Sequence, residues 1–467
     1  MHPAVQIRKT RPADKTGQYQ GQNFRIDAFG VRRMLFNQNI LLDPFPKRKL
    51  FQKFGNGRTG PTPSRQLFVR KGNLDLPNLI PTFKVHFVLH FFVLLSYWRN
   101  KSTVKHLLRH NPIQTHFPGL MGTVEYRRSL FVCPHCGASR FPGDELLDVV
   151  GTGFSPGVRR LMARAGSRTS FVEAESDLAT YANIQVNRRD IERIAEHLGR
   201  EVENWRNHLP TLPPEPVPIL YVSFDGTAVP MRRQEVAGRK GRQPDGSAKG
   251  REVKVGCVFT QTHTTDEGFP VRDNDSTTFV AGLESSTLFG ERIYQEAVHR
   301  GLDQARTVVV LTDGAAYNKT IVQTHFPKAT HIIDLYHARE HLHALAVLCR
   351  ATDQEEKWKD LLDQGAIGQL ADSVRPLIPK RGIPRKEALK ELSYFLKNKK
   401  LMQYAQFRRQ GFFIGSGVVE AGCRTVVAQR LKQPGMFWSV RGAHAILQLR
   451  CGFLSNLFDR FWDDRAA

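Results

Sequence analysis

Three acidic residues, Asp225, Asp313 and Glu420, stand where a fold could bring them together. Asp225 follows the apolar run 219–224 and Asp313 follows the apolar run 307–312, while Glu420 falls in the first turns of an expected helix. Carboxylates with no Lys or Arg beside them in sequence repel one another, and binding hard divalent cations through oxygen stabilises them together. A pair of such ions can activate an attacking oxygen and stabilise the leaving oxygen of a phosphodiester. Phosphodiester chemistry is therefore the first hypothesis.

Each of these acids also has an ordinary structural interpretation. Asp-Gly is a common turn, so Asp225 or Asp313 taken alone is more often a turn residue. Glu420 could favour the helix dipole or pair with Arg424 four residues later. The order strand, strand, helix in a basic chain favours the metal-binding interpretation of the three together.

The elements that must position these acids begin after a proline-rich linker at 211–218. Strands are expected at 219–224, 253–259, 277–283, 307–312 and 330–335, with helices at 289–301 and 317–325. Strands paired in series and then alternating with helices describe a mixed sheet covered by helices, so the expected fold class is α/β. Residues 338–410 are helix-rich and charged, and they look like an insertion into the sheet domain.

A helical region precedes the sheet. Ser155-Pro156 is a helix start signal, a second helix is expected at 171–181, and Asn187 is a good N-cap for a third. The basic residues near the start of this third helix are Arg188, Arg189 and Arg193. Helix, short turn and basic helix suit a helix-turn-helix DNA reader. An ordinary helical hairpin with a solvated charged face remains the alternative.

The charge of the chain is strongly positive and unevenly placed. The formal net charge is +24, from 68 Lys+Arg against 44 Asp+Glu. Residues 1–120 hold 20 Lys+Arg, 4 Asp and no Glu, so they carry 20 − 4 = +16 and leave 24 − 16 = +8 for the rest. Released counterions drive such a protein onto nucleic acid. The first 119 residues are either a basic, partly disordered arm or a stretch read out of frame.

Six cysteines are too few and too scattered for a disulfide framework, which indicates a reducing cytoplasm. Only Cys133 and Cys136 are close, as Cys-Pro-His-Cys, a knuckle that could hold zinc. Two further ligands would be needed, and neither His116 nor His135 has standard spacing. The apolar run 85–98 is too short to span a bilayer, so no membrane association is expected.

Several longer motifs carry a resemblance to a known family. They are Val222–Met231, Leu311–Asn318, His331–His337 and Gly415–Cys423, followed by Met436-Phe-Trp438 and Gly442-Ala443. Through them, residues 120–457 resemble the ISKra-type family of bacterial insertion-sequence transposases. The resemblance implies an RNase H-like catalytic core interrupted by a helical insertion. Matched motif by motif, it puts the DDE triad on Asp225, Asp313 and Glu420.

The resemblance also bears on residues outside the triad. Asp334 and His337 match a strand-end pair near the active site and are expected to support it without binding metal. Family members usually carry an earlier cysteine pair that completes a zinc site with the knuckle of Cys133 and Cys136. Residues 1–119 contain no cysteine, which favours the out-of-frame interpretation of that segment.

The sequence thus predicts a DNA transposase that cleaves donor ends and joins them to target DNA through a pair of magnesium ions, which manganese can replace. The expected partner is double-stranded DNA, bound by a homo-oligomer in the bacterial cytoplasm, at the nucleoid. A non-catalytic DNA-binding protein or an inactive transposase relic is the alternative. Less favoured is a zinc protease, because His337, Glu340 and His341 fit a His-x-x-Glu-His pattern but lack an identifiable third ligand.

These predictions divide the chain into six parts. They are an atypical basic segment at 1–119, a Cys-x-x-Cys region at 120–145, a helical DNA-binding region at 146–210, the first part of the RNase H-like core at 211–337, a helical insertion at 338–410, and final core helices with Glu420 at 411–467.

Overall fold

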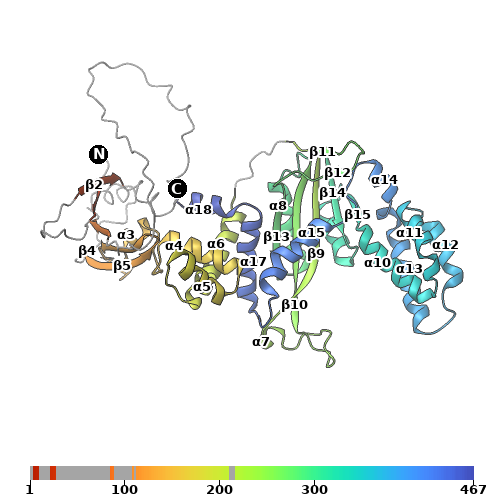
Figure 1. Ribbon diagram of the computed structural model, residues 1–467, viewed down its shortest axis with the longest axis horizontal. Coiled ribbons are helices and arrows are strands. Elements are labelled where there is room, and N and C mark those ends of the chain that lie inside the picture. Colours follow the sequence, from red (N-terminus) through yellow and green to blue (C-terminus); the bar gives the residue numbers. More distant parts are fainter. Residues whose placement is uncertain are drawn as a thin grey trace, which may run out of the picture. The chain divides into compact units, whose positions relative to one another are not determined.

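The computed structural model describes residues 112–209 and 216–466, together with four strands nearer the N-terminus (Figure 1). Those strands are β1 (Ala4–Lys9), β2 (Gln22–Asp27), β3 (Val85–Val88) and β4 (Leu108–Arg109). The rest of the segment 1–111 lies outside the described residues, and so does the expectation that this segment is a basic arm or a stretch read out of frame. The chain forms two compact units, one ending at Arg160 and one running from Leu161 to Arg465.

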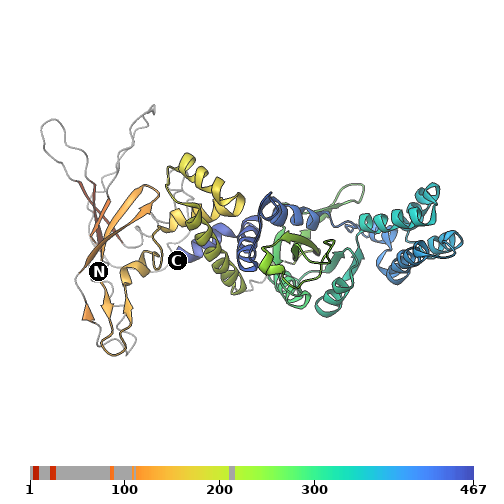
Figure 2. The same cartoon turned by 90° about the horizontal axis from the view of Figure 1, so that it is seen from below.

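The first unit is built on short strands (Figure 2). One sheet has the order β2-β1-β3-β6-β5, and a smaller one has the order β4-β7-β8. The further elements are β5 (Ile113–Gly119), β6 (Gly122–Arg128), β7 (Phe131–Val132), β8 (Ser139–Arg140), the helix α3 (Pro142–Leu146) and the start of α4 (Pro156–Arg168). Phe117 and Tyr126 meet edge to face inside the β5–β6 hairpin, and the Tyr126 hydroxyl donates to buried Asp144 at 2.7 Å. This small core holds the unit together.

The second unit is built around a five-stranded mixed sheet of order β13-β10-β9-β14-β15. Its strands are β9 (Ile219–Pro230), β10 (Gly250–Gln261), β13 (Thr278–Gly282), β14 (Thr307–Thr312) and β15 (Thr330–Ile333). β9, β10 and β13 pair antiparallel, whereas β14 pairs parallel to both β9 and β15. A mixed sheet flanked by helices, as the sequence predicts, is therefore confirmed.

Helices cover both faces of this sheet. α8 (Ser286–His299) and α9 (Ala316–His325) pack on the face that carries the even-numbered residues of β9. The opposite face receives α15 (Gly417–Gly422) and the π-helical segment 423–428, which contact β9 and β10. The apolar cluster under α8 and α9 includes Leu220, Val222, Phe224, Phe289, Ile293, Val310, Ile321 and Phe326.

One strand is longer than the sequence predicts. The apolar run 219–224 was expected to end at Asp225, but β9 continues to Pro230 because each of its residues pairs with β10, out to Pro230 beside Gly250. Asp225 therefore lies within β9, opposite Val255, and not at a strand end. The parallel neighbour β14 does end before Asp313.

Between 335 and 409 every described element is a helix or a short 3₁₀ turn. The helices are α10 (Leu335–Cys349), α11 (Glu355–Asp363), α12 (Ile367–Val374), α13 (Ile383–Asn398) and α14 (Tyr404–Arg409). They pack around fully buried Trp358, Leu362, Leu370 and Phe395. α10 directly follows β15, so these helices are attached at the edge of the sheet.

One helix cap before the sheet, Asn187, is the one that the sequence predicts, whereas the cap of the preceding helix was not predicted. α5 (Phe171–Ala182) starts with a capping box of Ser170 and Glu173, and the Asn187 side chain caps α6 (Arg188–Asn207) by accepting from Asp190 N at 2.9 Å. Yet α6 packs along α17 (Val440–Leu454). A side chain at Gly199 would collide with the backbone of Ala445. The expected division near residue 210 therefore does not separate compact units, since these helices are part of the sheet's unit.

Candidate active site

The register of β9 and β14 brings two of the three predicted acids together. Ser223 pairs in parallel with Leu311, so two residues further along each chain Asp225 and Asp313 reach the same level of the sheet. The Ser223 hydroxyl donates to the Leu311 carbonyl at 3.0 Å and fixes this register. Both aspartates are half-buried.

Glu420 comes from α15, which packs on the same face of the sheet as Asp225. A Cβ at Gly422 would lie 2.9 Å from the Phe279 ring, so only glycine permits this close approach. The helix then widens into the π-helical segment 423–428, a distortion common at functional sites. Buried Arg450 donates to two backbone carbonyls of that segment, Thr425 O and Val426 O. The sequence predicts the helix but carries no signal for the π turn.

The three acids interact electrostatically. Burial raises the pKa of Asp225, a hydrogen bond from Gly226 N lowers it, and the charges of Asp313 and Glu420 raise it further; the net shift is upward. The Cys423 thiol adds a weak contact to Asp225 Oδ2 at 3.7 Å. Loading this site with negative charge is thus unfavourable in the metal-free protein.

Two polar residues that the sequence analysis missed hold the acids in place. Asn318, fully buried, donates from Nδ2 to Asp313 Oδ1 at 2.6 Å, and Ala315 N donates to the same oxygen at 2.9 Å. Ser416 donates from Oγ to Glu420 Oε1 at 2.9 Å. Both lie inside motifs that carry the resemblance, Leu311–Asn318 and Gly415–Cys423, but the sequence assigns them no role because that role depends on contacts made only in the fold.

Asp334 is fully buried and caps α10. Its Oδ1 accepts from His337 N at 2.7 Å, and its Oδ2 accepts from Ser416 N. Asp334 is therefore bonded to the residue that in turn holds Glu420. His337 projects from the first turn of α10, with Nδ1 3.3 Å from Glu340 Oε2.

The chemistry of the three acids suits a hard cation, since they offer carboxylate oxygens, and the charges of Asp313 and Glu420 raise the pKa of Asp225. Across the described residues, however, no three His, Cys, Asp or Glu side chains are already arranged closely enough to hold one metal ion. This applies equally to the protease pattern, where the His341 ring nitrogen is 2.5 Å from Glu391 Oε2 and its ring stacks on Tyr394. The protease alternative gains no support.

The predicted nucleic-acid residues lie on α6, in the second unit. Arg188, Arg189 and Arg193 are exposed on the first turns of α6, and Arg193 pairs with Asp190 at 2.9 Å. In the first unit, Cys133 and Cys136 lie on the turn between β7 and β8. Backbone N–H groups of Cys136 and His135 lower the pKa of the Cys133 thiol. The described residues provide no third ligand for zinc there.

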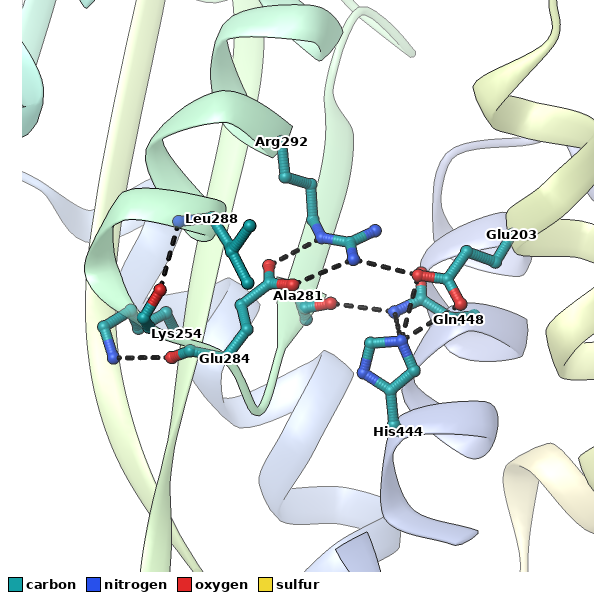
Figure 3. Close-up of polar contacts among 9 residues, drawn as sticks. Glu203, Lys254, Ala281, Glu284, Leu288, Arg292, His444 and Gln448 are labelled. Atoms are coloured by element: carbon teal, nitrogen blue, oxygen red, sulfur yellow. Dashed lines mark hydrogen bonds and ion pairs between the residues drawn. The ribbon is translucent and has the colours of Figure 1, made fainter. Parts of the chain in front are cut away.

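A second acidic cluster lies in the second unit, and its carboxylates are paired with cationic side chains (Figure 3). Arg292 of α8 forms two bonds to Glu284, at 2.7 and 3.0 Å, and one to Glu203 of α6 at 2.9 Å. His444 of α17 lies 2.9 Å from Glu203, and Gln448 donates to Ala281 O. Burial alone would raise the pKa of Glu203, but His444 and Arg292 lower it below its usual range.

Comparisons with known proteins place the chain in no family. No protein-family model matches it, and no curated protein matches it. Among solved structures, the Drosophila P element transposase strand transfer complex is similar over 67% of this chain and 81% of that chain, at 10% sequence identity and a TM-score of 0.23. A similarity this low supports no inference about fold or function. Among the described helices, none is both long and apolar enough to cross a membrane.

Proposed function

We propose that this chain is a DNA transposase with an RNase H-like core, which cleaves and joins DNA strands at the site of Asp225, Asp313 and Glu420. One observation carries the proposal. Two parallel strands in register bring two aspartates to one level of the sheet, and a helix packed on the same face adds a glutamate whose charge raises the pKa of Asp225. Uncompensated acids in this arrangement call for cations.

The surrounding architecture supports the same proposal. An RNase H-like core requires a mixed sheet flanked by helices, and the second unit has one. The helices of 335–409 follow β15 and precede α15, so they interrupt the chain between the second aspartate and the glutamate. This is where the proposed insertion belongs.

Within the proposed mechanism, the carboxylates of Asp225, Asp313 and Glu420 would hold magnesium or manganese. When bound, such ions supply Lewis-acid activation of the attacking oxygen and stabilise the leaving oxygen. The chain's own contribution is orientation: Asn318 fixes one oxygen of Asp313 and Ser416 fixes one oxygen of Glu420. Each hydrogen bond leaves the second oxygen of its carboxylate for a ligand.

Double-stranded DNA is the proposed substrate, bound by a homo-oligomer of this chain. The charge of +24 favours association with a polyanion. Exposed Arg188, Arg189 and Arg193 on α6 offer contacts to its backbone or grooves.

A plasmid-nicking assay tests the proposed function. Wild-type protein should nick supercoiled plasmid with Mg²⁺ or Mn²⁺ and not in a chelator. Asp225→Asn, Asp313→Asn and Glu420→Gln should each lower the rate by roughly 10³-fold or more, because residues that act as one unit fail together. DNA affinity should stay near that of the wild type.

Matched controls come from exposed acids on the same unit. Asp275→Asn, at a left-handed position that asparagine tolerates, and Glu291→Gln remove the same charge away from the site. Both should nick at the wild-type rate. A triad variant that nicks as fast as these controls would remove that residue from the site, and DNA binding without any nicking would favour a non-catalytic DNA-binding protein.

A further inference from the structure

A groove of about 630 Å³ lies between α9 and α13, directly beyond Asp313. One wall consists of Gly314 and the first turns of α9, and the other consists of the last turns of α13. Three lysines contribute to the lining, namely Lys319, Lys390 and Lys397. We call this feature the α9–α13 groove.

The charges of this groove are poorly compensated. Lys390 reaches Glu387 at 3.5 Å on the surface, but among the described residues neither Lys319 nor Lys397 has an acidic partner. The amino-terminal end of α9, at Ala316, adds the positive end of a helix dipole to the same wall. Converging positive charges of this kind are stabilised by an anion.

A buried polar atom in the lining also lacks a partner. Asn398, at the end of α13, is 3% exposed; its Nδ2 donates to Tyr394 O at 2.8 Å, while its Oδ1 accepts no hydrogen bond. An unsatisfied buried acceptor is unfavourable until a donor reaches it. Because this oxygen is itself shielded from solvent, the attraction of the groove for a phosphate rests on its lysines and on the end of α9.

A residue that lines the groove contacts one of the proposed catalytic acids directly. Tyr394 of α13 donates from its hydroxyl to Asp313 O at 3.2 Å, and its ring stacks on His341 with centroids 4.0 Å apart. Gly314 has a φ of +86°, and a Cβ there would lie 2.9 Å from Ile333 and 3.3 Å from the Tyr394 ring. A chain of phosphates lying in the groove would therefore pass beside Asp313.

We propose that the α9–α13 groove binds the phosphate backbone of the nucleic-acid strand that enters or leaves the carboxylate site. The proposal rests on the proposed function, because it takes DNA as the substrate. It assigns Lys319 and Lys397 to strand binding and gives the inserted helices a direct part in holding DNA.

Binding of a labelled duplex oligonucleotide, measured on the full chain without divalent metal, tests the groove. Lys319→Gln/Lys397→Gln should weaken binding about tenfold and reduce the slope of log K against log salt by about 1.8, the value for two phosphate contacts. The matched control is Lys357→Gln/Lys380→Gln, which removes two exposed lysines elsewhere in 335–409, one on α11 and one in the bend before α13. It should leave both quantities near wild type. Equal losses in the two double variants would mean a bulk charge effect and overturn the proposal.

A site-specific cross-link provides a second, independent readout. Gln323 lines the groove on α9, and Gln369 is an exposed glutamine on α12. With Cys136, an exposed thiol, replaced by serine, Gln323→Cys should form a disulfide with thiol-tethered DNA far faster than Gln369→Cys. Equal cross-linking rates for the two cysteine variants would overturn the proposal. If inorganic tripolyphosphate inhibited the Gln323→Cys cross-link as strongly as unlabelled DNA does, the groove would hold an isolated anion, and the proposal would also be overturned.

The two proposals fail differently. If the groove is wrong, the Lys319/Lys397 double variant binds like wild type while the triad variants still lose nicking. If the proposed function is wrong, wild-type protein does not nick DNA, or the triad variants nick normally, whatever the binding data show.

Discussion

The two acidic clusters of the second unit differ in what surrounds them. Within β9, Asp225 lies near two more acidic residues, Asp313 and Glu420, whose charges help to raise its pKa. In the cluster around Arg292, Glu203 has comparable burial but is bonded to a guanidinium and a histidine, and its pKa is lowered. The paired cluster joins three helices of the fold, whereas the unpaired cluster costs stability. Acids kept at such a cost are candidates for function.

The largest stability effect should come from breaking the paired cluster. Arg292→Gln leaves Glu284 without its cation and Glu203 with His444 alone, so the free energy of unfolding should fall by about 3 kcal/mol. Urea unfolding followed by tryptophan fluorescence measures it. Arg306→Gln, at an exposed arginine without a side-chain partner in the described structure, is the control. Equal midpoints for the two variants would show that the Arg292 cluster does not hold the fold together.

In the cluster of Asp225, Asp313 and Glu420, removing a charge should raise the free energy of unfolding. Without metal at neutral pH, Asp225→Asn should stabilise the protein by a gain on the order of 1 kcal/mol, a common size for a single substitution. Because the folded pKa of Asp225 lies above its unfolded value, the wild type loses stability as pH rises through these two values. The gain from asparagine should therefore vanish in acid, where Asp225 is protonated in both states.

Glu203 provides the contrasting pH profile. Its folded pKa is lowered, so its contribution is present above the unfolded pKa and is lost as pH falls through the folded value. Glu203→Gln should thus destabilise the protein at neutral pH and have little effect in strong acid. Unfolding curves of both variants across this pH range measure the contrast, and parallel profiles would contradict it.

Local sequence patterns predicted the strands around the acids but not their full length. Short apolar runs followed by Asp225 and Asp313 predicted two strands of the sheet, but the run 219–224 could not reveal that β9 continues to Pro230. That extension depends on pairing with β10, whose contribution a local pattern does not contain. Asp334 could have been recognised as a helix cap from its place before α10.

The sequence did not predict contacts between residues that are far apart along the chain. The packing of Gly199 on Ala445 joins α6 to the sheet's unit across most of the domain. Ser416 and Asn318 are ordinary polar residues until the fold brings them to Glu420 and Asp313. No periodicity or spacing identifies such partners, because their function is defined by three-dimensional distance.

The smallest expected effect concerns orientation within the unpaired cluster. Ser416→Ala removes the hydrogen bond to Glu420 Oε1 and should slow nicking about tenfold without changing DNA affinity, as expected for one positioned contact. Ser373→Ala, whose hydroxyl bonds only its own helix backbone at 2.9 Å, is the matched control. If both variants nick equally fast, Ser416 does not position Glu420. Ser416→Thr, which keeps the hydroxyl, should restore most of the rate.

Manganese binding tests the central claim most directly. Electron paramagnetic resonance of Mn²⁺ titrated into the full chain with duplex DNA present should show a pair of bound ions for the wild type. Asp225→Asn, Asp313→Asn and Glu420→Gln should each lose that signal, whereas Glu203→Gln should keep it. Unchanged manganese binding in all three triad variants would contradict the claim that these carboxylates form a metal site.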